Sequence, residues 1–337
     1  MPKKLFLVFI LCLSVLSLLC LSPGTGEKKT RLILATATTG GTYYPVGVAI
    51  ATLISTHLED SDNILMTAIS SAGSGENIQL LKNKEADLAI IQSLNGEMAR
   101  QGKGRYKNDP QPFLRSISVL WENVEHFVIL EKFVDSGDMS DLKNIRKKNF
   151  SIGRRGSGTE ISGREILKSL GYFPEKDFRL SFLGYASSAN ALQNGRIVGM
   201  NIPAGPPASA ITQAFAAIGS KKIRILEFTE NQVKAVNLVF PVWKRFMIPP
   251  DTYPGQKKVI QTISQPNLLV VHQDLPEDVV YKIVKTMYEN LDYLKKIHQA
   301  TRVMSLDSAV SGLAIPLHPG AVRYYEEKGL SIPSKLK

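Results

Sequence analysis

Residues 33–58 read ILATATTGGTYYPVGVAIATLISTHL. The stretch opens with a short apolar run, which is typical of a buried strand, and passes into a loop rich in Gly and Thr. Apolar residues then recur at helical spacing from Val46 to Leu58, and Pro45 suits the first turn of a helix. The stretch therefore predicts a strand, a glycine-rich loop and a helix in succession.

The same alternation continues along the chain and predicts two α/β series. The first has strands at 33–37, 66–70 and 86–91 and helices at 45–58 and 76–82. The second has strands at 150–153, 179–183, 197–202 and 223–226 and helices at 158–170, 187–194 and 207–218. A further strand at 268–272 and helices at 277–291 and 319–328 follow. Such alternation is typical of parallel sheets covered by helices.

Two strands predicted at 117–120 and 126–130 have little helix between them, which breaks the rhythm. We interpret this break as a crossing between two lobes. We expect lobe 1 to comprise residues 27–121 and 236–337, and lobe 2 to be an insertion at 122–235. The predicted fold class is α/β, with a hinge and a ligand cleft between the two lobes.

The N-terminus has the pattern of a secretory signal. Lys3 and Lys4 precede an almost wholly apolar run, and small residues follow at 22–26. This order predicts a signal peptide at 1–26, cleaved near Gly24 to Gly26, and export to the periplasm. The alternatives are an uncleaved anchor helix or a lipid anchor through Cys20.

Both cysteines, Cys12 and Cys20, lie inside this predicted signal peptide. The mature chain would therefore have no disulfide, no thiolate metal site and no cysteine nucleophile. No later stretch is apolar enough to cross a bilayer, which excludes a multi-span permease.

The net charge of +11 raises the question of a polyanionic partner. The basic residues are scattered and are not interleaved with aromatic residues, as they would be in a single-strand binder. We therefore predict no nucleic-acid partner and interpret most of this charge as a solvated surface.

Four loops that follow predicted strands share one chemistry. They occupy residues 38–45, 70–77, 92–93 and 154–160, and they are rich in Gly, Ser and Thr. Ligands of open α/β sheets bind outside the carboxyl ends of the strands, and helix N-termini direct amide N–H groups at anions. The alternative is that each loop only caps its helix. The candidate ligand-binding residues are Gly41, Thr42, Tyr43, Ser71, Ser74, Asn77, Gln92, Ser93, Arg154, Arg155, Ser157, Gly158, Thr159, Ala204 and Tyr253.

Some of these candidates have alternative roles. One of Arg154 and Arg155 would clamp a carboxylate, because neighbours on an extended segment point to opposite sides. The alternative is that both face solvent. Tyr43, Tyr185 and Tyr253 would form a flat wall or pack in the core, and Ala204 follows a strand at a cleft edge.

Ordered motifs from about Leu32 to Leu330 resemble the TAXI group of solute receptors, the extracytoplasmic subunits of TRAP transporters. The matching segments are Gly40–Pro45, Gly75–Asn77, Ala86–Ala89, Gln92–Ser93, Gly156–Glu160, Thr252–Gln256, Leu275–Tyr281 and Pro316–Ala321. The resemblance implies a periplasmic binding protein-like fold, a permease partner in the membrane and a small organic anion as the ligand.

Relatives in that group are thought to bind glutamate, glutamine or a dicarboxylate. This chain departs from the group at Ser70–Ser74, which usually reads Thr-Gly-Gly-Ser, and at Arg154-Arg155, which often reads Ala-Pro. The extra arginine charge leads to the hypothesis of an acid with more than one carboxylate. We expect a monomer without a cofactor or metal.

An enzyme is the first rival interpretation. The five histidines have no metal-ligand spacing, and no Gly-x-Ser-x-Gly elbow is present. The loop at 153–158 lacks the order of a phosphate or dinucleotide loop. We therefore predict no catalysis. A second rival, a sensor subunit that signals to a membrane receptor, stays open because the fold serves both roles.

Overall fold

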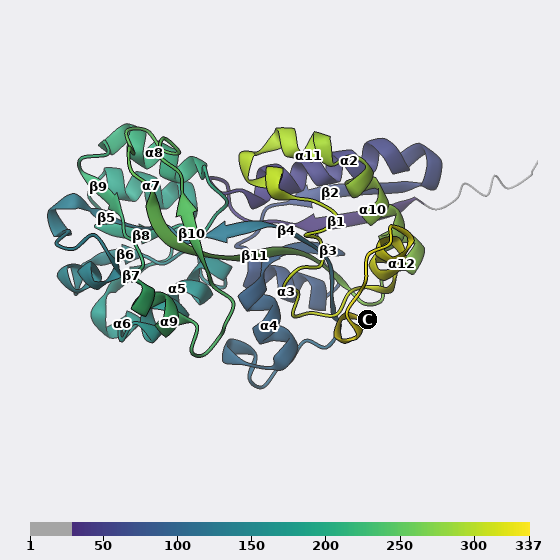
Figure 1. Ribbon diagram of the computed structural model, residues 1–337, viewed down its shortest axis with the longest axis horizontal. Coiled ribbons are helices and arrows are strands. Elements are labelled where there is room, and N and C mark those ends of the chain that lie inside the picture. The colour runs from purple at the N-terminus through teal and green to yellow at the C-terminus, as the bar shows by residue number, and fades with distance from the viewer. Residues whose placement is uncertain (1–28) are drawn as a thin grey trace, which may run out of the picture.

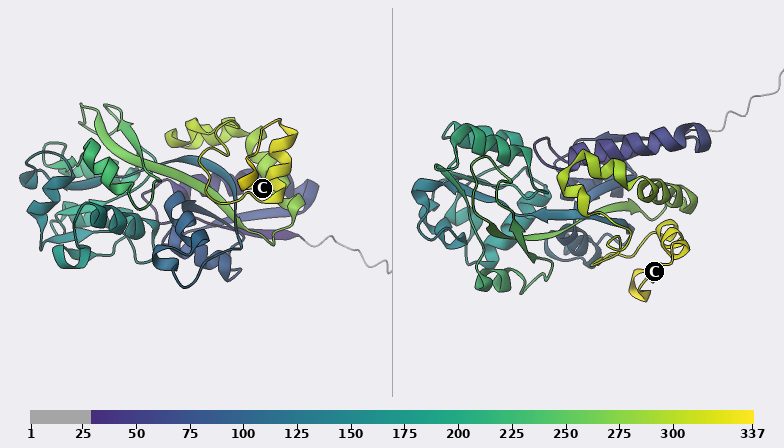
Figure 2. Two further views of the ribbon diagram at one scale, coloured as in Figure 1. Left: turned by 60° about the horizontal axis from the view of Figure 1, so that its bottom comes forward. Right: turned by 45° about the horizontal axis from the view of Figure 1, so that its top comes forward.

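The protein consists of two α/β lobes that lie side by side (Figure 1). The computed structural model describes residues 29–337, so the predicted signal peptide with Cys12 and Cys20 lies outside the described residues. One lobe contains a six-stranded sheet and the other a five-stranded sheet. Figure 2 shows from two further directions that β11 runs from one lobe to the other.

The sheet of the first lobe combines parallel and antiparallel strands. It comprises β1 (Thr30–Ala35), β2 (Ile64–Ile69), β3 (Leu88–Gln92), β4 (Leu114–Val124), β10 (Lys244–Ile248) and β11 (Ile260–His272). The order is β10-β11-β3-β1-β2, and β4 also pairs with β11. β1 is parallel to β2 and β3, whereas β11 is antiparallel to its neighbours. The prediction of a parallel sheet is therefore confirmed for the first three strands.

The second sheet repeats this arrangement on a smaller scale. It comprises β5 (Phe127–Leu130), β6 (Asn149–Ser151), β7 (Arg179–Ser181), β8 (Gly199–Asn201) and β9 (Ile223–Ile225). The order is β7-β6-β8-β5-β9. β6 is parallel to β7 and β8, and β5 is antiparallel to β8 and β9. In both lobes the parallel strands end toward the other lobe.

Helices cover both faces of each sheet (Figure 1). The first lobe carries α2 (Tyr43–Asp62), α3 (Ser74–Lys82), α4 (Ser93–Gln101), α10 (Glu277–Glu289), α11 (Leu291–Ile297) and α12 (Pro319–Glu327). The second lobe carries α5 (Gly158–Ser169), α6 (Pro174–Asp177), α7 (Tyr185–Gln193), α8 (Ser209–Ile218) and α9 (Glu230–Val236). Short 3-10 turns lie at 104–106, 131–133, 139–145, 299–303 and 334–336. Within residues 29–337, no helix combines the length and apolar character that a bilayer crossing requires.

Apolar burial explains these elements. β3 is buried at every position, as expected of a central strand covered on both faces. α2 buries one face, which includes Val46, Ile50 and Ile54, against the first sheet. Burial of such side chains contributes about 1.5–3 kcal/mol each, so packing outweighs the modest helix propensity of β-branched residues.

The lobes are joined by long strands. β4 leads through residues 125–126 into β5, and β10 and β11 form a hairpin in the first sheet. The hairpin residues Ile248, Tyr253 and Ile260 nevertheless pack in the apolar cluster of the second lobe. The strands at 30–124 and 244–272 belong to one sheet and those at 127–225 to the other. The predicted residue limits of the lobes stay a proposal.

Several elements were absent from the sequence-based prediction, among them α6, α9 and α11, or are longer than predicted, as β4 is. β11 begins at Ile260, whereas the prediction began at 268. The prediction was too short because Gln265 and Asn267 interrupt the apolar pattern of the strand, although both are buried. β10 and α4 were not predicted. α4 mixes polar residues with the apolar residues Leu94, Met98 and Ala99, which it buries where it packs against β3 and β11.

Asn77 holds the strand ends of the first lobe together. Its Nδ2 donates to the carbonyl oxygens of Thr36 at 2.7 Å and Ile90 at 2.8 Å, after β1 and within β3. Its Oδ1 lies 2.6 Å from the Ser71 hydroxyl, and Ser71 Oγ accepts from the amide of Gly73 at 2.9 Å. Asn77 and Ser71 therefore shape the loop before α3 through buried hydrogen bonds.

We predict that Asn77→Ala lowers the free energy of unfolding by about 2–4 kcal/mol, because it removes the buried hydrogen bonds of Asn77 to the carbonyls of Thr36 and Ile90 and to the Ser71 hydroxyl. Urea unfolding of the purified protein measures this loss. Gln79→Ala is the matched control, because Gln79 is exposed on the same helix, and it should change the free energy by less than about 0.5 kcal/mol. Equal effects of the two substitutions would contradict the role assigned to Asn77.

Two titratable side chains are buried where β4 passes into β5. Glu125 accepts a hydrogen bond from Asn201 Nδ2 at 3.0 Å, and burial raises the pKa of its carboxyl to about 7. His126 contacts the Ile202 carbonyl through Nδ1 at 2.9 Å and the Tyr253 hydroxyl through Nε2 at 2.7 Å. Burial lowers the pKa of the His126 ring to about 4. Both groups are therefore neutral over much of the acidic range.

The raised pKa of Glu125 predicts that the free energy of unfolding depends on pH. The unfolded chain loses this proton near pH 4.5 and the folded chain near pH 7, so the stability that Glu125 contributes falls as the pH rises through that window. Glu125→Gln should match the wild type at pH 4 and exceed its free energy of unfolding by up to about 3 kcal/mol at pH 8. Urea titrations at both pH values measure the difference. A variant that is less stable than the wild type at pH 8 would refute this expectation.

Candidate functional site

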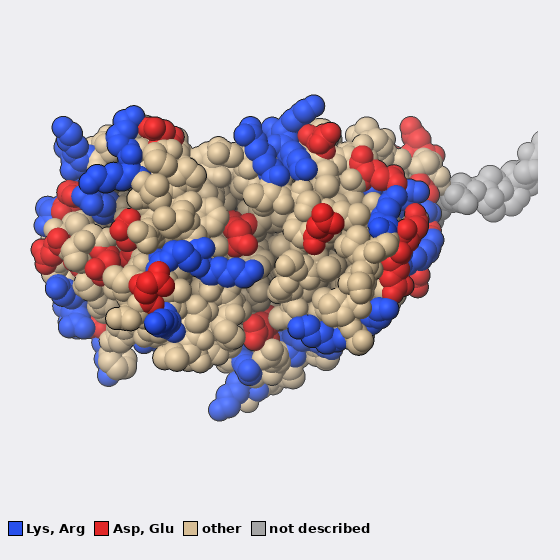
Figure 3. All heavy atoms as spheres, viewed as in Figure 1, with Lys and Arg blue, Asp and Glu red and all other residues tan. Residues whose placement is uncertain are grey.

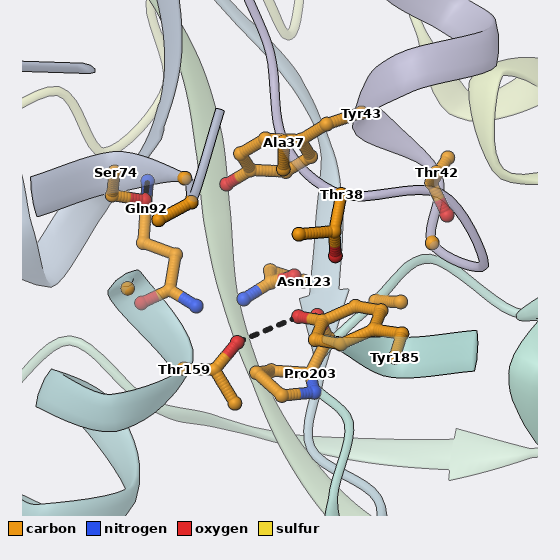
Figure 4. A pocket seen from close by; sticks show the side chains of 15 residues that line it. Ala37, Thr38, Thr42, Tyr43, Ser74, Gln92, Asn123, Thr159, Tyr185 and Pro203 are labelled. Carbon is orange, nitrogen blue, oxygen red and sulfur yellow. Dashed lines mark hydrogen bonds between the residues drawn. The ribbon is translucent and has the colours of Figure 1, made fainter. Parts of the chain in front are cut away.

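A small polar pocket lies where the loops of the two lobes meet (Figure 4). Its cavity volume is about 20 Å³, close to the space that one water molecule needs. The lining residues are Ala37, Thr38, Gly41, Thr42, Tyr43, Ala72, Gly73, Ser74, Gln92, Asn123, Gly158, Thr159, Tyr185, Pro203 and Ala204. These residues come from both lobes, so the pocket exists only when the lobes are together.

Five helices begin at this pocket. The lining residues include the first residues of α2, α3, α5 and α7, and the residue that precedes α4. The first amide groups of a helix have no acceptor within their own helix and carry a partial positive charge. The positive ends of five helix dipoles therefore converge on a pocket whose described lining includes no charged side chain.

One loop in each lobe is held by a glutamate in the same way. In the first lobe, Glu76 accepts from the amide of Ala72 at 2.5 Å. In the second lobe, Glu160 accepts from the amide of Gly156 at 2.7 Å. Both glutamates follow a Gly-Ser-Gly segment at the start of a helix, so the sequence repeats one local structure at both walls of the pocket.

Direct hydrogen bonds hold these walls together. The Glu76 amide donates to the Gly156 carbonyl at 3.0 Å, and the Ala210 amide donates to the Gly40 carbonyl at 3.0 Å. Thr42 Oγ1 donates to the Gly205 carbonyl at 2.9 Å. Each bond joins one lobe to the other, so the structure represents a closed arrangement.

Tyr185 is central to the wall of the pocket that the second lobe forms. Its hydroxyl donates to the Pro203 carbonyl at 2.7 Å and lies 2.7 Å from Thr159 Oγ1, which must therefore be the donor in that pair. Burial raises the pKa of the Tyr185 phenol, which stays neutral at physiological pH. A Cβ at Gly41 would lie 2.8 Å from the Tyr185 ring, so a glycine is needed at this point.

Eight of the predicted site residues line the pocket: Gly41, Thr42, Tyr43, Ser74, Gln92, Gly158, Thr159 and Ala204. Four others support it from behind without lining it. Ser71 and Asn77 shape a loop, Ser157 caps α5 by accepting from the Glu160 amide at 3.0 Å, and Ser93 begins α4. Their role in ligand contact stays a prediction.

The remaining three candidates lie elsewhere. Arg155 is exposed and stacks over the Phe182 ring at 3.7 Å. Arg154 is exposed and lines a neighbouring groove of about 440 Å³, which also contains Thr38 and Tyr185. Tyr253 is buried in the second lobe beside His126. None of the three is among the described residues that line the small pocket. For Arg155 and Tyr253 the reason is packing with nearby aromatic side chains, which directs them away from the pocket.

Sequence reasoning did not assign Asn123 to the site, although this residue lines the pocket. Asn123 is 1% exposed, and neither its Nδ2 nor its Oδ1 has a hydrogen-bond partner within residues 29–337. The strand at 114–124 also contains Arg115, Ser116, Ser118 and Glu122, so a further polar residue in it gives no distinct signal in the sequence. For Tyr185 the sequence leaves open a flat wall or core packing, and the structure places it in the lining of the pocket.

The pocket is uncharged in its own side chains, because the described lining residues include no Lys, Arg, His, Asp or Glu. Figure 3 shows Lys and Arg in small groups among Asp and Glu on one face of the molecule. Across residues 29–337, no cluster of three or more His, Cys, Asp or Glu side chains is placed to hold a metal ion.

Comparison with known proteins gives a family and a fold. The model of the NMT1-like family matches residues 34–329. A solved structure described as a periplasmic transporter is similar at 15% identity and a TM-score of 0.51, with 90% of this chain and 93% of that chain covered. This match confirms the predicted periplasmic binding protein-like fold.

Two further structures are similar at lower scores. The periplasmic aliphatic sulphonate binding protein of Escherichia coli has 10% identity and a TM-score of 0.43, with 89% of this chain and 84% of that chain covered. A putative L-cystine ABC transporter protein of Listeria monocytogenes has 12% identity and a TM-score of 0.48, with 81% of this chain and 97% of that chain covered.

The closed arrangement leaves no room for a side chain at Gly75. A Cβ there would lie 2.3 Å from the Gly156 carbonyl oxygen of the other lobe. We predict that Gly75→Ala keeps each lobe folded but prevents closure. Small-angle scattering should show a larger radius of gyration, and circular dichroism should be unchanged.

Gly184→Ala is the matched control at the same boundary. Its Cβ would meet Thr38 at 3.4 Å, an ordinary van der Waals contact, and its φ of −70° suits any residue. This variant should scatter like the wild type. If Gly75→Ala also gives the wild-type radius, the contact with Gly156 does not control closure.

Proposed function

Because the chain belongs to the NMT1-like family, we propose that it is an exported solute-binding subunit of a membrane transporter. It captures a small organic anion between its lobes and delivers it to a permease. The observation that carries this proposal is the convergence of five helix N-termini on one pocket between two lobes.

The preference for an anionic solute follows from the electrostatic effect of the helix N-termini. Each helix N-terminus favours a negative charge by about 0.3–1 kcal/mol, and by up to about 2 kcal/mol where it is partly buried. The pocket adds the hydroxyl groups of Ser74 and Thr42. Such neutral donors suit a carboxylate in a pocket that excludes water.

The binding cycle that we propose is hinge closure. The cavity of about 20 Å³ is too small for a solute of several carbon atoms, so the lobes must part to admit one. A solute that contacts both walls favours the closed state by the difference between its contacts in the two states. The hydrogen bonds from Glu76 to Gly156 and from Thr42 to Gly205 also form only on closure.

The transporter that we propose is of the TRAP type. This choice rests on the ordered motifs that resemble TAXI receptors, among them Gly40–Pro45 and Gly156–Glu160. The same resemblance implies an amino acid or a dicarboxylate such as glutamate as the solute. We further propose a periplasmic location after cleavage near Gly24 to Gly26, and a monomer without catalytic activity or a cofactor.

A binding experiment tests the solute class. The mature protein is isolated gently, and native mass spectrometry identifies the small molecule that it carries. We expect a carboxylic acid, and calorimetry should show that its methyl ester binds at least 100-fold more weakly. A neutral or cationic solute would contradict the proposal, and so would equal affinities for the acid and its ester.

A second observation separates transport from sensing. A gene for a large multi-span permease beside this one favours delivery of the solute, whereas a gene for a membrane kinase favours a sensor subunit. The fold is compatible with both roles, because the partner reads the closed surface in either case.

A further inference from the structure

Five buried carboxamide side chains cluster beneath the pocket. We call this cluster the carboxamide floor; it consists of Gln92, Asn95, Asn123, Gln265 and Asn267, each at most 3% exposed. Gln92 and Asn267 face each other between β3 and β11, and Asn123 and Gln265 face each other between β4 and β11. The floor is therefore built by three separate parts of the chain: β3 with α4, β4, and β11.

The floor is connected to the walls of the pocket. The Tyr43 hydroxyl donates to Asn267 Oδ1, and the Leu94 amide donates to Gln265 Oε1 at 2.8 Å. Asn95 Nδ2 donates to Gln92 Oε1 at 3.0 Å. Figure 4 shows that the side chains of Gln92 and Asn123 extend into the space enclosed by Tyr43, Thr159 and Tyr185.

Several atoms of the floor lack partners. Within residues 29–337, no hydrogen bond is formed by Asn123 Nδ2, Asn123 Oδ1, Gln265 Nε2, Asn267 Nδ2 or Asn95 Oδ1. Buried polar groups in folded proteins nearly always have partners, and an unpaired one costs stability. A cluster of such groups at a binding pocket is expected where a solute or its water supplies the missing partners.

The chemistry of the floor excludes a second negative charge at this depth. Carboxamides donate and accept as neutral groups, and the described lining of the pocket includes no cation to neutralise a buried carboxylate. A neutral group that both donates and accepts suits this environment.

We propose that the carboxamide floor binds a neutral amide or hydroxyl group of the solute, so that the preferred solute is a small monocarboxylate with such a group and not a dicarboxylate. This inference rests on the proposed function, because it assigns the carboxylate of the same solute to the helix N-termini. Asn123 is the residue that determines specificity, because it lines the pocket and both its amide atoms are free.

A matched series of four-carbon acids tests this preference. Calorimetry with the full mature protein compares succinamate, 4-hydroxybutyrate, succinate and butyrate. We expect succinamate or 4-hydroxybutyrate to bind at least tenfold more tightly than both succinate and butyrate. Butyrate loses the contacts to the floor, and succinate has to bury a second charge there.

Two variants distinguish a role in binding from a role in folding. Asn123→Leu should reduce the preference for succinamate over butyrate at least tenfold, while the Tm without solute stays the same or rises. Asn237→Leu is the control, because Asn237 bonds to Val233 and Trp243 away from the pocket. It should lower the Tm and leave the preference unchanged. A lower Tm for Asn123→Leu with an unchanged preference would assign Asn123 a structural role and overturn the inference.

The outcomes separate this inference from the proposed function. If succinate binds most tightly and Arg154→Ala removes that advantage, the second carboxylate lies in the neighbouring groove, and only the role of the floor is refuted. If butyrate equals succinamate, the floor again has no role in recognition. If no acid of the series binds, the carboxylate site itself fails and this inference fails with it.

Discussion

The close approach of two backbone segments at the lobe boundary controls the rest of the site. The amide of Glu76, in the first turn of α3, donates to the carbonyl of Gly156 at 3.0 Å. This contact requires that Gly75 has no side chain, and it brings the N-termini of α3 and α5 to one point. Two of the five helix N-termini at the pocket, one from each lobe, therefore meet through this contact.

In the function that we propose, helix dipoles and not ionised side chains attract the anion. Arg154 and Arg155, which the sequence places in a strand-end loop, are exposed, and Arg155 stacks on Phe182. Amide donors that the fold holds in place need no reorganisation when a solute enters, and they cost less to desolvate than a guanidinium group. The proposed function therefore requires a neutral pocket that holds the anion between two lobes and closes without burying an unpaired side-chain charge.

Buried polar residues around the pocket fall into two groups. Asn77 and Ser71 satisfy one another and nearby backbone groups, so they build the loop before α3. Asn123 and Asn267 retain unpaired amide groups at equal or similar burial. The first group stabilises the lobe, whereas the second group has hydrogen-bonding capacity left over for a solute. Burial alone does not distinguish the two groups. They differ in whether their side-chain polar atoms have hydrogen-bond partners.

The sequence by itself determined the strand–loop–helix units, the two series of such units and the Gly- and Ser-rich loops at their strand ends. These features depend on apolar periodicity and turn chemistry within a few residues, which are local properties. Eight of the fifteen candidate residues line the pocket for this reason. Only the tertiary structure decided which of them face the solute space and which polar residues join them. Asn123 reaches the pocket because β4 pairs with β11, with Asn123 opposite Gln265. Pairing between strands so distant in the chain is set by the packing of the whole core, and no local pattern records it.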